Sequence, residues 1–469
     1  MYCVVLFHRD LRLTDNTAFL AAAKSSYKII PVFIFPPEQI DPTTNQYFSH
    51  PAVQFLCDSL KDLDTQLQSL GSRLYMFKGD TVTVLKHIHA KVPYHRLYQN
   101  QDYTVYAKQR DEKVATFCSK QEIAFENTED YDLVGIKEGL LYDGRPYTVL
   151  SQYFNKFQKE LHVRSVDKRK VKGDQLVGHI DNLYQQIDLD ALYKHNTGVE
   201  RGGRTEGLKR LRLLRDMKAY TNTRDYPAIN GTTRLSAHLK FGTISVREVY
   251  NVVKQLYGPA HGIIRELVFR SFYIKIYIHR PELQRGTAYR DYLDKNIVWK
   301  TQKTGKKEWT AWVTGTTGFP LCDAGMRQLL HEGWVHNRVR MLVASVPTRY
   351  LFLDWRDTSR YFYQHLVDCD TISNTAGWQW ASGVGPDAAP YFRAPMNPFI
   401  QSKKFDTEAE YIRRYIPELS KVKAEHIHRW DEEKIRKLYP TVDYPAPIIG
   451  QKEASKRSSA AFKAAYFKS

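Results

Sequence analysis

The chain has 469 residues, 42% of them hydrophobic, and a formal net charge of +18. The length predicts two domains rather than one core, and the hydrophobic content excludes an intrinsically disordered chain. The positive charge fits either a soluble basic protein or one that binds a polyanion such as nucleic acid, and composition alone does not separate these classes.

The first residues, MYCVVLFHRDLRL, lack a secretory pattern, and no apolar run reaches the roughly 20 residues that span a bilayer. The five cysteines are odd in number and include no C-x-x-C pair, which argues against a disulfide framework and a cysteine zinc site. We therefore expect an intracellular protein that is not bound to a membrane and holds no metal.

Residues 1–130 alternate short apolar runs with helix-like stretches. The apolar runs are predicted to be buried strands: YCVVLF, KIIPVFIF, RLYMF and RLYQN. The helix-like stretches between them are Asn16–Ala23, Val53–Leu70, Val82–Ile88 and Val105–Gln121. This alternation predicts a Rossmann-like α/β domain with a parallel sheet and helices on both faces. The G-x-G-x-x-G fingerprint of dinucleotide-binding folds is absent after the first run.

The rest of the chain differs from this pattern. Residues 131–204 have few strand signals and are predicted to form a connector. Residues 205–445 show helical periodicity, for example in IIRELVFRSFYIKIYI, DAGMRQLLHEG and HNRVRMLVASVPTRYLF, and are predicted to be an all-α domain. Residues 446–469 form a basic tail, for which a solvated end is the favoured interpretation.

Tryptophans gather in the helical half, where seven of the eight lie between Trp299 and Trp380. The segment NTAGWQWASG holds Trp378 and Trp380 two residues apart. On a helix, Asn374 and Trp378 share a face, whereas Trp380 points nearly the opposite way. The pair is either two core tryptophans or a wall that touches two different ligands.

Polar groups stand close to these indoles in the sequence. DCDTISN places two carboxylates before Asn374, and GWVHNRVRM places an amide and two arginines on one helical turn. These groups form either an ordinary ion-pair network or the polar lining of an apolar cofactor pocket. They are Asp368, Asp370, Asn337, Arg338 and Arg340.

Upstream, the run Thr232–Ser236 follows Gly231 and is predicted to open a helix. Hydroxyls, backbone N–H groups and an arginine at such a point suit a phosphate, although a simple capping turn is the alternative. Glu266 shares a face of an apolar helix with Phe269 and Arg270, where a carboxylate needs a partner or a task.

Five ordered blocks resemble the photolyase and cryptochrome family. They are VVLFHRDLRLTDNTAFLAAA, TRLSAHLKFGTIS, TGFPLCDAGMRQL, GWVHNRVRM and NTAGWQWASGVGPDAAPYFR with the following NPFIQSKKFD. The resemblance runs from about residue 2 to residue 418, nearly the whole chain. Within the family, the sequence is most similar to class I photolyases, which repair cyclobutane pyrimidine dimers.

The resemblance implies an α/β antenna domain followed by an all-α FAD-binding domain. It assigns FAD binding to Tyr220, Arg224, Thr232, Thr233, Arg234, Leu235, Ser236, Asn337, Arg340, Asp368, Asp370 and Asn374. Asn374 matches the asparagine that faces the flavin N5 atom. Trp378, Trp355 and Trp299 match the tryptophan chain that passes an electron from the surface to the photoexcited flavin.

The resemblance also implies a cavity for a pyrimidine dimer that has flipped out of UV-damaged DNA. The residues assigned to it are Glu266, Phe269, Arg338, Met341, Trp380 and Arg393. Phe269 and Ile263 stand where the family usually has larger aromatic residues, and YFRAPMNP carries an extra residue before Asn397. Tyr106 and Ala107 do not match the pair found in folate-binding antennas, so a second chromophore would be a deazaflavin, a second flavin or absent.

The function that we expect is therefore light-driven repair of cyclobutane pyrimidine dimers by a monomeric photolyase that transfers an electron from reduced FAD. The alternative is a cryptochrome-like blue-light photoreceptor without repair activity, a class that often carries a long C-terminal extension. Repair of six-four photoproducts fits less well, because that subgroup has histidines where this chain has Asn337 and Met341.

Overall fold

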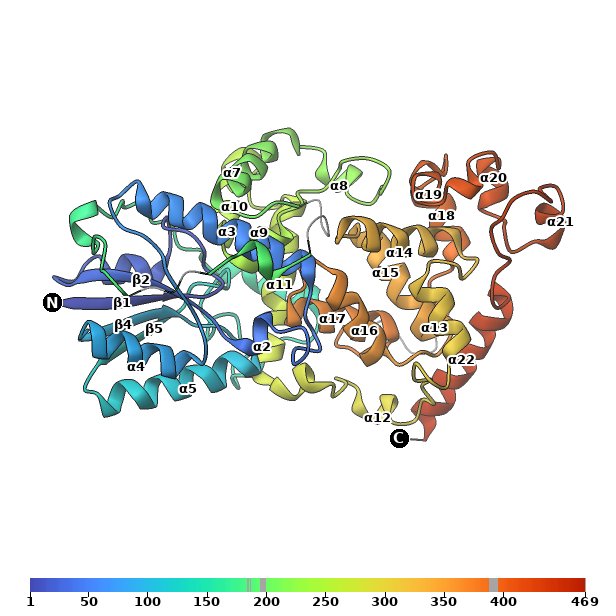
Figure 1. Ribbon diagram of the computed structural model, residues 1–469. Coiled ribbons are helices and arrows are strands. Elements are labelled where there is room, and N and C mark those ends of the chain that lie inside the picture. The colour runs from blue at the N-terminus through green and yellow to red at the C-terminus, as the bar shows by residue number, and fades with distance from the viewer. Residues whose placement is uncertain (184, 186, 195–199, 388–394, 469) are drawn as a thin grey trace.

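The computed structural model divides into an N-terminal α/β region built on a parallel sheet and a helical region that follows it (Figure 1). This arrangement confirms the predicted fold class. The residues that the structure describes are 1–183, 185, 187–194, 200–387 and 395–468.

Five parallel strands form the sheet, in the spatial order β3-β2-β1-β4-β5. The strands are β1 (Tyr2–Phe7), β2 (Lys28–Phe35), β3 (Tyr75–Lys78), β4 (Arg96–Asn100) and β5 (Ala124–Thr128). The four predicted strands are confirmed, whereas the sequence analysis missed β5. This strand pairs with β4 at one edge of the sheet, and its sequence, AFENT, contains no fully buried side chain, so no apolar run marks it.

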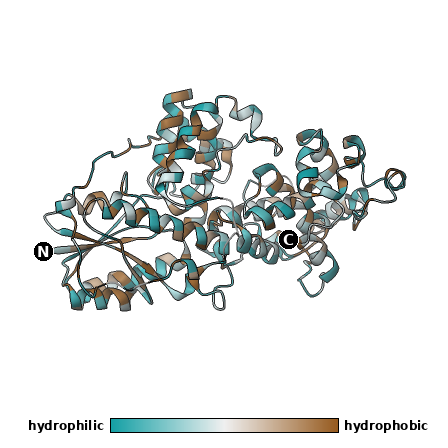
Figure 2. Ribbon diagram, turned by 45° about the horizontal axis from the view of Figure 1, so that its top comes forward, coloured by the Kyte–Doolittle hydropathy of each residue, from teal (hydrophilic) through white to brown (hydrophobic). Residues whose placement is uncertain are grey.

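Helices cover both faces of the sheet, and the hydrophobic strands lie between them (Figures 1 and 2). The helices of this region are α1 (Thr17–Ala22), α2 (Pro37–Ile40), α3 (His50–Gln68), α4 (Thr81–Lys91) and α5 (Val105–Lys120). Four of them match the predicted helical stretches. The fifth, α2, was missed because a helix of one turn leaves no periodic signal.

The order of the strands reverses at β1, which pairs with β2 on one side and with β4 on the other. At such a point the loops that leave the carboxyl ends of neighbouring strands diverge and open a crevice. His8 and Arg9 follow β1, and Asp102 follows β4. The sheet therefore presents a group of polar side chains at this edge.

In the described part of the predicted connector, residues 131–204, α6 (Leu150–Glu160) is an α-helix, and α7 (Arg204–Leu213) begins at the last residue. Tyr153 and Phe157 of α6 are buried, and the Tyr153 hydroxyl lies 2.9 Å from the Oγ atom of Ser271 in the helical region. The connector thus packs on the helical region as well as joining the two parts. The residue limits predicted for the α/β domain, the connector, the helical domain and the C-terminal tail stay predictions.

The remainder of the described chain is largely helical, as its periodicity predicts. Its α-helices are α7 (Arg204–Leu213), α8 (Tyr220–Thr223), α9 (Ser236–Phe241), α10 (Val246–Tyr257), α11 (Gly262–His279), α12 (Asp291–Asp294), α13 (Lys306–Val313), α14 (Pro320–Glu332), α15 (Asn337–Ser345), α16 (Trp355–His365), α17 (Thr371–Ser382), α18 (Pro398–Phe405), α19 (Glu410–Tyr415), α20 (Ala424–Ile427), α21 (Glu433–Arg436) and α22 (Gln451–Phe467). Of the helices that the structure describes, none combines the length and the apolar character that crossing a membrane requires.

The C-terminal residues form a packed helix, so the expectation of a solvated end was wrong. Phe462 of α22 lies under the guanidinium group of Arg349, whose central carbon is 3.9 Å from the ring centroid. Small residues make up most of the packed stripe, which is why hydrophobicity alone did not reveal it. The residues that α22 buries are Ala454, Ser458, Phe462 and Ala465.

Buried charges join the α/β region to the helical region. Arg247 of α10 donates to Asp15 Oδ2 at 2.8 Å and to Asp130 Oδ1 at 2.7 Å, and Arg12 pairs with the same Asp130. All four side chains are at most 4% exposed. Burial alone would raise the pKa of Asp130, but the charges of Arg12 and Arg247 hold this pKa well below its usual value. Asp130 is therefore an anion that two arginines share between the regions.

Candidate functional site

One face of α17 is exposed although the helix packs against α11, α15 and α16. Ile372 and Ala376 are buried, whereas Ser373 and Gly377, one turn apart on a neighbouring face, are exposed. A Cβ atom built on Gly377 would meet no described atom within 4 Å. The helix therefore borders open space in which a flat group can approach its backbone.

Two arginines flank the indole of Trp334. The guanidinium carbon of Arg234 lies 4.0 Å from a ring centroid of Trp334, and that of Arg340 lies 5.9 Å away. Arg340 Nη2 is also 2.8 and 3.0 Å from the two oxygens of Asp368, and Arg234 Nη1 donates to Glu200 at 2.9 Å. Both arginines are half-buried, so their remaining donors suit the oxygens of a diphosphate.

The run Thr232–Ser236 leads into α9, which begins at Ser236. No side chain caps this helix, so its first N–H groups can donate to a ligand oxygen. Arg234 adopts a φ of 50°, an uncommon conformation for a residue other than glycine, which turns the chain just before the helix. Together with the open face of α17 and the arginines, this turn fits a dinucleotide cofactor with a planar ring.

Tyr220, at the start of α8, Arg224, just after its end, and Glu266 of α11 form a chain of contacts. The guanidinium carbon of Arg224 lies 5.6 Å from the ring centroid of Tyr220, and Arg224 forms an ion pair with Glu266 of α11. Glu266 thus has the partner that a carboxylate on an apolar helix requires. Its side chain remains 31% exposed, so it can still meet a ligand.

Asp370 connects the two regions. Its side chain accepts from the Ser373 N–H at 2.8 Å and so caps α17, and it accepts from Arg9 and from the Tyr131 hydroxyl at 2.7 Å each. Burial alone would raise the pKa of Asp370, but Arg9 and Arg270 hold it well below its usual value. The structure thus places Asp370 in an interdomain network, and a direct contact of this residue with FAD stays a prediction.

Asn374 and Trp378 lie one turn apart on α17, as predicted. Asn374 Nδ2 donates to the backbone oxygen of Ser359 at 3.3 Å and to its Oγ atom at 3.0 Å. Trp378 is buried, with its ring centroid 5.6 Å from that of Phe362. Trp380 is half-buried and donates its indole N–H to the backbone oxygen of Asp387 at 3.1 Å. The two indoles therefore have separate environments.

Trp299 and Trp355 both donate an indole N–H to the Oδ1 atom of Asp294, at 2.9 and 3.0 Å. Asp294 was not predicted from the sequence, because nothing in its neighbourhood, YRDYLDKN, distinguishes it from a surface residue. Trp312, whose ring centroid lies 6.0 Å from that of Trp378, was not predicted either.

The residues assigned to DNA lie in several places. Arg338 lines an open hollow with Tyr226, Lys404 and Phe405, and it pairs with Asp225 at 2.7 Å. Of the others, Phe269 packs against Tyr273 and is half-buried, Met341 is half-buried, and Arg393 lies outside the described residues. The roles of these residues in DNA binding stay predictions.

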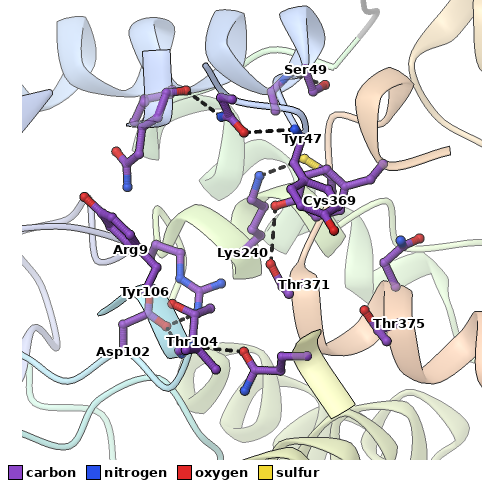
Figure 3. Close-up of a pocket in the computed structure, with 18 of the residues that line it drawn as sticks. Arg9, Tyr47, Ser49, Asp102, Thr104, Tyr106, Lys240, Cys369, Thr371 and Thr375 are labelled. Carbon is purple, nitrogen blue, oxygen red and sulfur yellow. Dashed lines mark hydrogen bonds and ion pairs between the residues drawn. The ribbon is translucent and has the colours of Figure 1, made fainter. Parts of the chain in front are cut away.

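A cavity of about 400 Å³ lies between the carboxyl edge of the sheet and the helical region. Figure 3 shows side chains from the α/β region around it, together with side chains from α9 and α17. Trp355 and Asn374 also line this cavity, so it reaches the helices that carry the predicted flavin site. The labelled residues that line it are Arg9, Tyr47, Ser49, Asp102, Thr104, Tyr106, Lys240, Cys369, Thr371 and Thr375.

Lys240 brings a buried cation to this cavity. Its Nζ atom lies 3.2 Å from Cys369 Sγ and 4.1 Å from the ring centroid of Phe241. Among the described residues, no carboxylate lies within ion-pair distance of Lys240. A buried ammonium group without an anionic partner favours an anionic ligand in the cavity.

The family models that match the chain agree with this geometry. One, described as DNA photolyase, matches residues 3–171, and another, the FAD binding domain of DNA photolyase, matches residues 263–464. The second match includes Arg340 and the helix α17 with its open face. The helical region is therefore an FAD-binding domain.

Known proteins resemble the chain over nearly its whole length. A deoxyribodipyrimidine photo-lyase of Alkalihalophilus pseudofirmus is 35% identical and covers 98% of this chain and 97% of its own. An archaeal photolyase from Sulfolobus tokodaii, solved with two FAD molecules, has a TM-score of 0.85 and 35% identity, and covers 99% of this chain and 100% of its own.

A bacterial class III photolyase from Agrobacterium tumefaciens has a TM-score of 0.88 and 29% identity, and covers 99% of this chain and 98% of its own. The nearer similarity to class I enzymes stays a prediction. Matches to both regions, and the similarity along the full length, lead to one conclusion: the chain belongs to the photolyase and cryptochrome family.

Proposed function

We propose that the protein repairs UV-damaged DNA by splitting cyclobutane pyrimidine dimers in a light-driven reaction. The full-length similarity to deoxyribodipyrimidine photo-lyases supports an enzyme of this kind. The observation that carries the proposal is α17, which has an open face beside Asn374, a buried indole at Trp378 and a half-buried indole at Trp380. Such a helix can separate a cofactor from a substrate.

FAD, when bound, supplies the reduced and light-excited electron donor. The residues that would hold its phosphates are Arg234, Arg340 and the first N–H groups of α9. Asn374 is oriented by its hydrogen bonds to Ser359, which leaves its carbonyl oxygen available to the ring. The absence of a side chain at Gly377 allows the ring to approach the helix.

The substrate side depends on stacking and on charge. Trp380 offers an aromatic face, and stacking of a base on such a face contributes about 1–3 kcal/mol. The ion pair with Arg224 orients the Glu266 carboxylate, so that its second oxygen can accept a hydrogen bond from a base edge. Arg338 and Lys404 line the open hollow and would contact phosphates of the DNA.

The three predicted relay residues would supply the electron that reduces the flavin beforehand. Trp378 is buried on α17, and Trp355 and Trp299 meet at a common carboxylate. Trp299 is half-buried, so the relay would end where a donor in solution can reach it. This order would move electrons inward from the surface, as the family resemblance implies.

A repair assay tests the proposal directly. Chemically reduced holoprotein is mixed with dimer-bearing DNA and exposed to near-UV or blue light, and the number of dimers is followed with time. We expect dimers to disappear in the light and to persist in the dark control. Flavin photochemistry without any loss of dimers would contradict the proposal and support the cryptochrome-like photoreceptor instead.

We further propose that the cavity at the sheet edge holds a second light-absorbing cofactor with an anionic group beside Lys240. The solved Sulfolobus tokodaii photolyase with two FAD molecules supports a flavin as the first candidate. An absorption spectrum of the purified protein, before and after Lys240→Met, tests this. Loss of a second chromophore with FAD retained is expected, whereas an unchanged spectrum would argue against the site.

A further inference from the structure

The buried indole of Trp378 stands at a fork in the aromatic core. On one side its ring centroid lies 6.0 Å from that of Trp312, which in turn lies 5.6 Å from that of Trp309. We call Trp312 and Trp309 the inner-core branch. Trp309 is half-buried, so this branch also leads from Trp378 toward the surface.

The other side of the fork is α16. Phe362 contacts Trp378, and Ser359 accepts the hydrogen bonds of Asn374, so this face of α16 lies against α17. Trp355 is one turn before Ser359 on the same face. We call Trp355 and Trp299 the carboxylate branch, because their N–H groups share Asp294.

The two branches differ in the charge that meets the indole N–H groups. Trp312 Nε1 donates to the backbone oxygen of Val343 at 3.1 Å, which is a neutral acceptor. Trp355 and Trp299 donate to one carboxylate oxygen, so their two nitrogens lie within about 6 Å of each other.

The carboxylate is buried and fixed in place. The Asp294 side chain is 5% exposed, and its second oxygen pairs with Arg356. Arg356 also pairs with Asp354 at 3.2 Å, and its guanidinium carbon lies 4.6 Å from the ring centroid of Trp355, so two carboxylates and one guanidinium group stand beside this indole. The carboxylates of this group outnumber its guanidinium by one, whereas the indole N–H of Trp312 meets a neutral carbonyl.

An indole that has lost an electron is a cation. Hydrogen bonds in which one partner is charged are about twice as strong as neutral ones, and a buried carboxylate is weakly screened. Asp294 would therefore stabilise positive charge on Trp355 or Trp299 more than a carbonyl stabilises it on Trp312. Since the same oxygen contacts both indoles, the charge can move from Trp355 to Trp299 without losing this contact.

We propose that Asp294 selects the branch of the fork that carries positive charge away from Trp378. The inference rests on the proposed function, in which these indoles reduce the flavin. FAD, when bound and excited by light, would supply the electron acceptor. Trp378 would give up one electron and be refilled by Trp355, which would in turn be refilled by Trp299, while the indole N–H protons stay in place. A one-electron donor in solution, such as a thiol, then refills Trp299.

Light-driven reduction of the FAD-loaded protein tests this proposal. Asp294→Asn removes the charge, and we expect the yield of photoreduction to fall about tenfold, the change that losing a charged hydrogen-bond partner produces. In the Asp294→Asn protein, adding Trp309→Phe should lower the remaining yield further. Trp309→Phe alone should leave the yield of the parent protein unchanged. Asp294→Glu should restore the yield, and Asp291→Asn, in the same short helix but in an exposed ion pair with Lys295, is the matched control.

A second readout does not depend on photochemistry. The indole N–H proton resonances of the dark protein report the acceptor directly, and in Asp294→Asn those of Trp299 and Trp355 should move while that of Trp312 stays. Arg356→Gln, which keeps the carboxylate, should not lower the yield; an equal loss in this variant would mean that packing and not charge decides the route.

The outcomes separate this inference from the proposed function. If Trp299→Phe leaves photoreduction unchanged, the relay itself is absent and both ideas fail. If Trp299→Phe lowers the yield but Asp294→Asn does not, the relay stands and the role of Asp294 is refuted. A loss of yield from Trp309→Phe in the parent protein would also overturn the proposed selection.

Discussion

The edge of the α/β region and the interior of the helical region are built from different side chains. At the sheet edge, charges dominate: Arg9 joins Asp102 to Asp370, and Lys240 stands in the cavity beside them. Within the helical region, rings dominate, with Trp312 packed against Trp378. Charged groups need fixed partners, so they set the position of one region against the other, whereas aromatic rings can pack closely without such partners.

This difference assigns a task to each region. The charged edge orients α17, because Asp370 both caps that helix and binds Arg9 across the boundary. The aromatic interior gives oxidisable rings in contact, and Asp294 is a buried carboxylate beside two of them. The comparison therefore predicts that changes at the boundary affect folding, and that changes among the rings affect electron supply and substrate binding.

The largest effect is expected within the rings. Trp355→Phe should leave the fold and the FAD content intact but reduce the rate of light-driven flavin reduction to a small fraction of the parent rate, because phenylalanine is much harder to oxidise. Absorption spectra recorded during illumination measure this. Trp430→Phe is the matched control, since Trp430 is equally buried but packs against Tyr439 and Tyr444. A parent-like rate of flavin reduction in Trp355→Phe would contradict the assignment of electron supply to the aromatic rings.

At the boundary, Asp130→Ala should lower the free energy of unfolding by about 3–5 kcal/mol, because it leaves Arg12 and Arg247 buried without their shared anion. Chemical denaturation measures the loss. The control is Lys61→Ala, whose ion pair with Asp190 is nearly half exposed and should contribute only about 0–1 kcal/mol. Equal effects of the two changes would show that burial of the charges is unimportant here.

The smallest effect is expected at the outer indole of α17. Trp380→Ala should weaken binding of dimer-bearing DNA by about 1–3 kcal/mol through lost stacking. Its hydrogen bond to Asp387 is also lost, but Trp378 and its contacts remain. A binding titration with damaged and undamaged DNA, together with the rate of photoreduction, tests this. Joint loss of DNA binding, photoreduction and FAD would instead indicate that Trp378 and Trp380 are two tryptophans that pack in the core.

Much of the architecture was accessible from local patterns. The alternation of apolar runs and helical stretches predicted the sheet, and the two-residue spacing predicted that Trp378 and Trp380 have different surroundings. These predictions succeed because a strand or helix displays its own periodicity whatever it packs against. The same reasoning missed β5, whose edge position leaves its side chains partly exposed, and it missed the packing of α22, whose buried stripe consists mostly of small residues.

What the sequence by itself determined is the family and the two regions. Only the tertiary structure decided the partners of single residues: Asp370 with Arg9, Glu266 with Arg224, and Asp294 with two indoles. Asp370 and Arg9 are separated by 361 positions in the chain. Such pairs depend on how distant elements pack, and no local period records which side chains that packing brings within hydrogen-bonding distance.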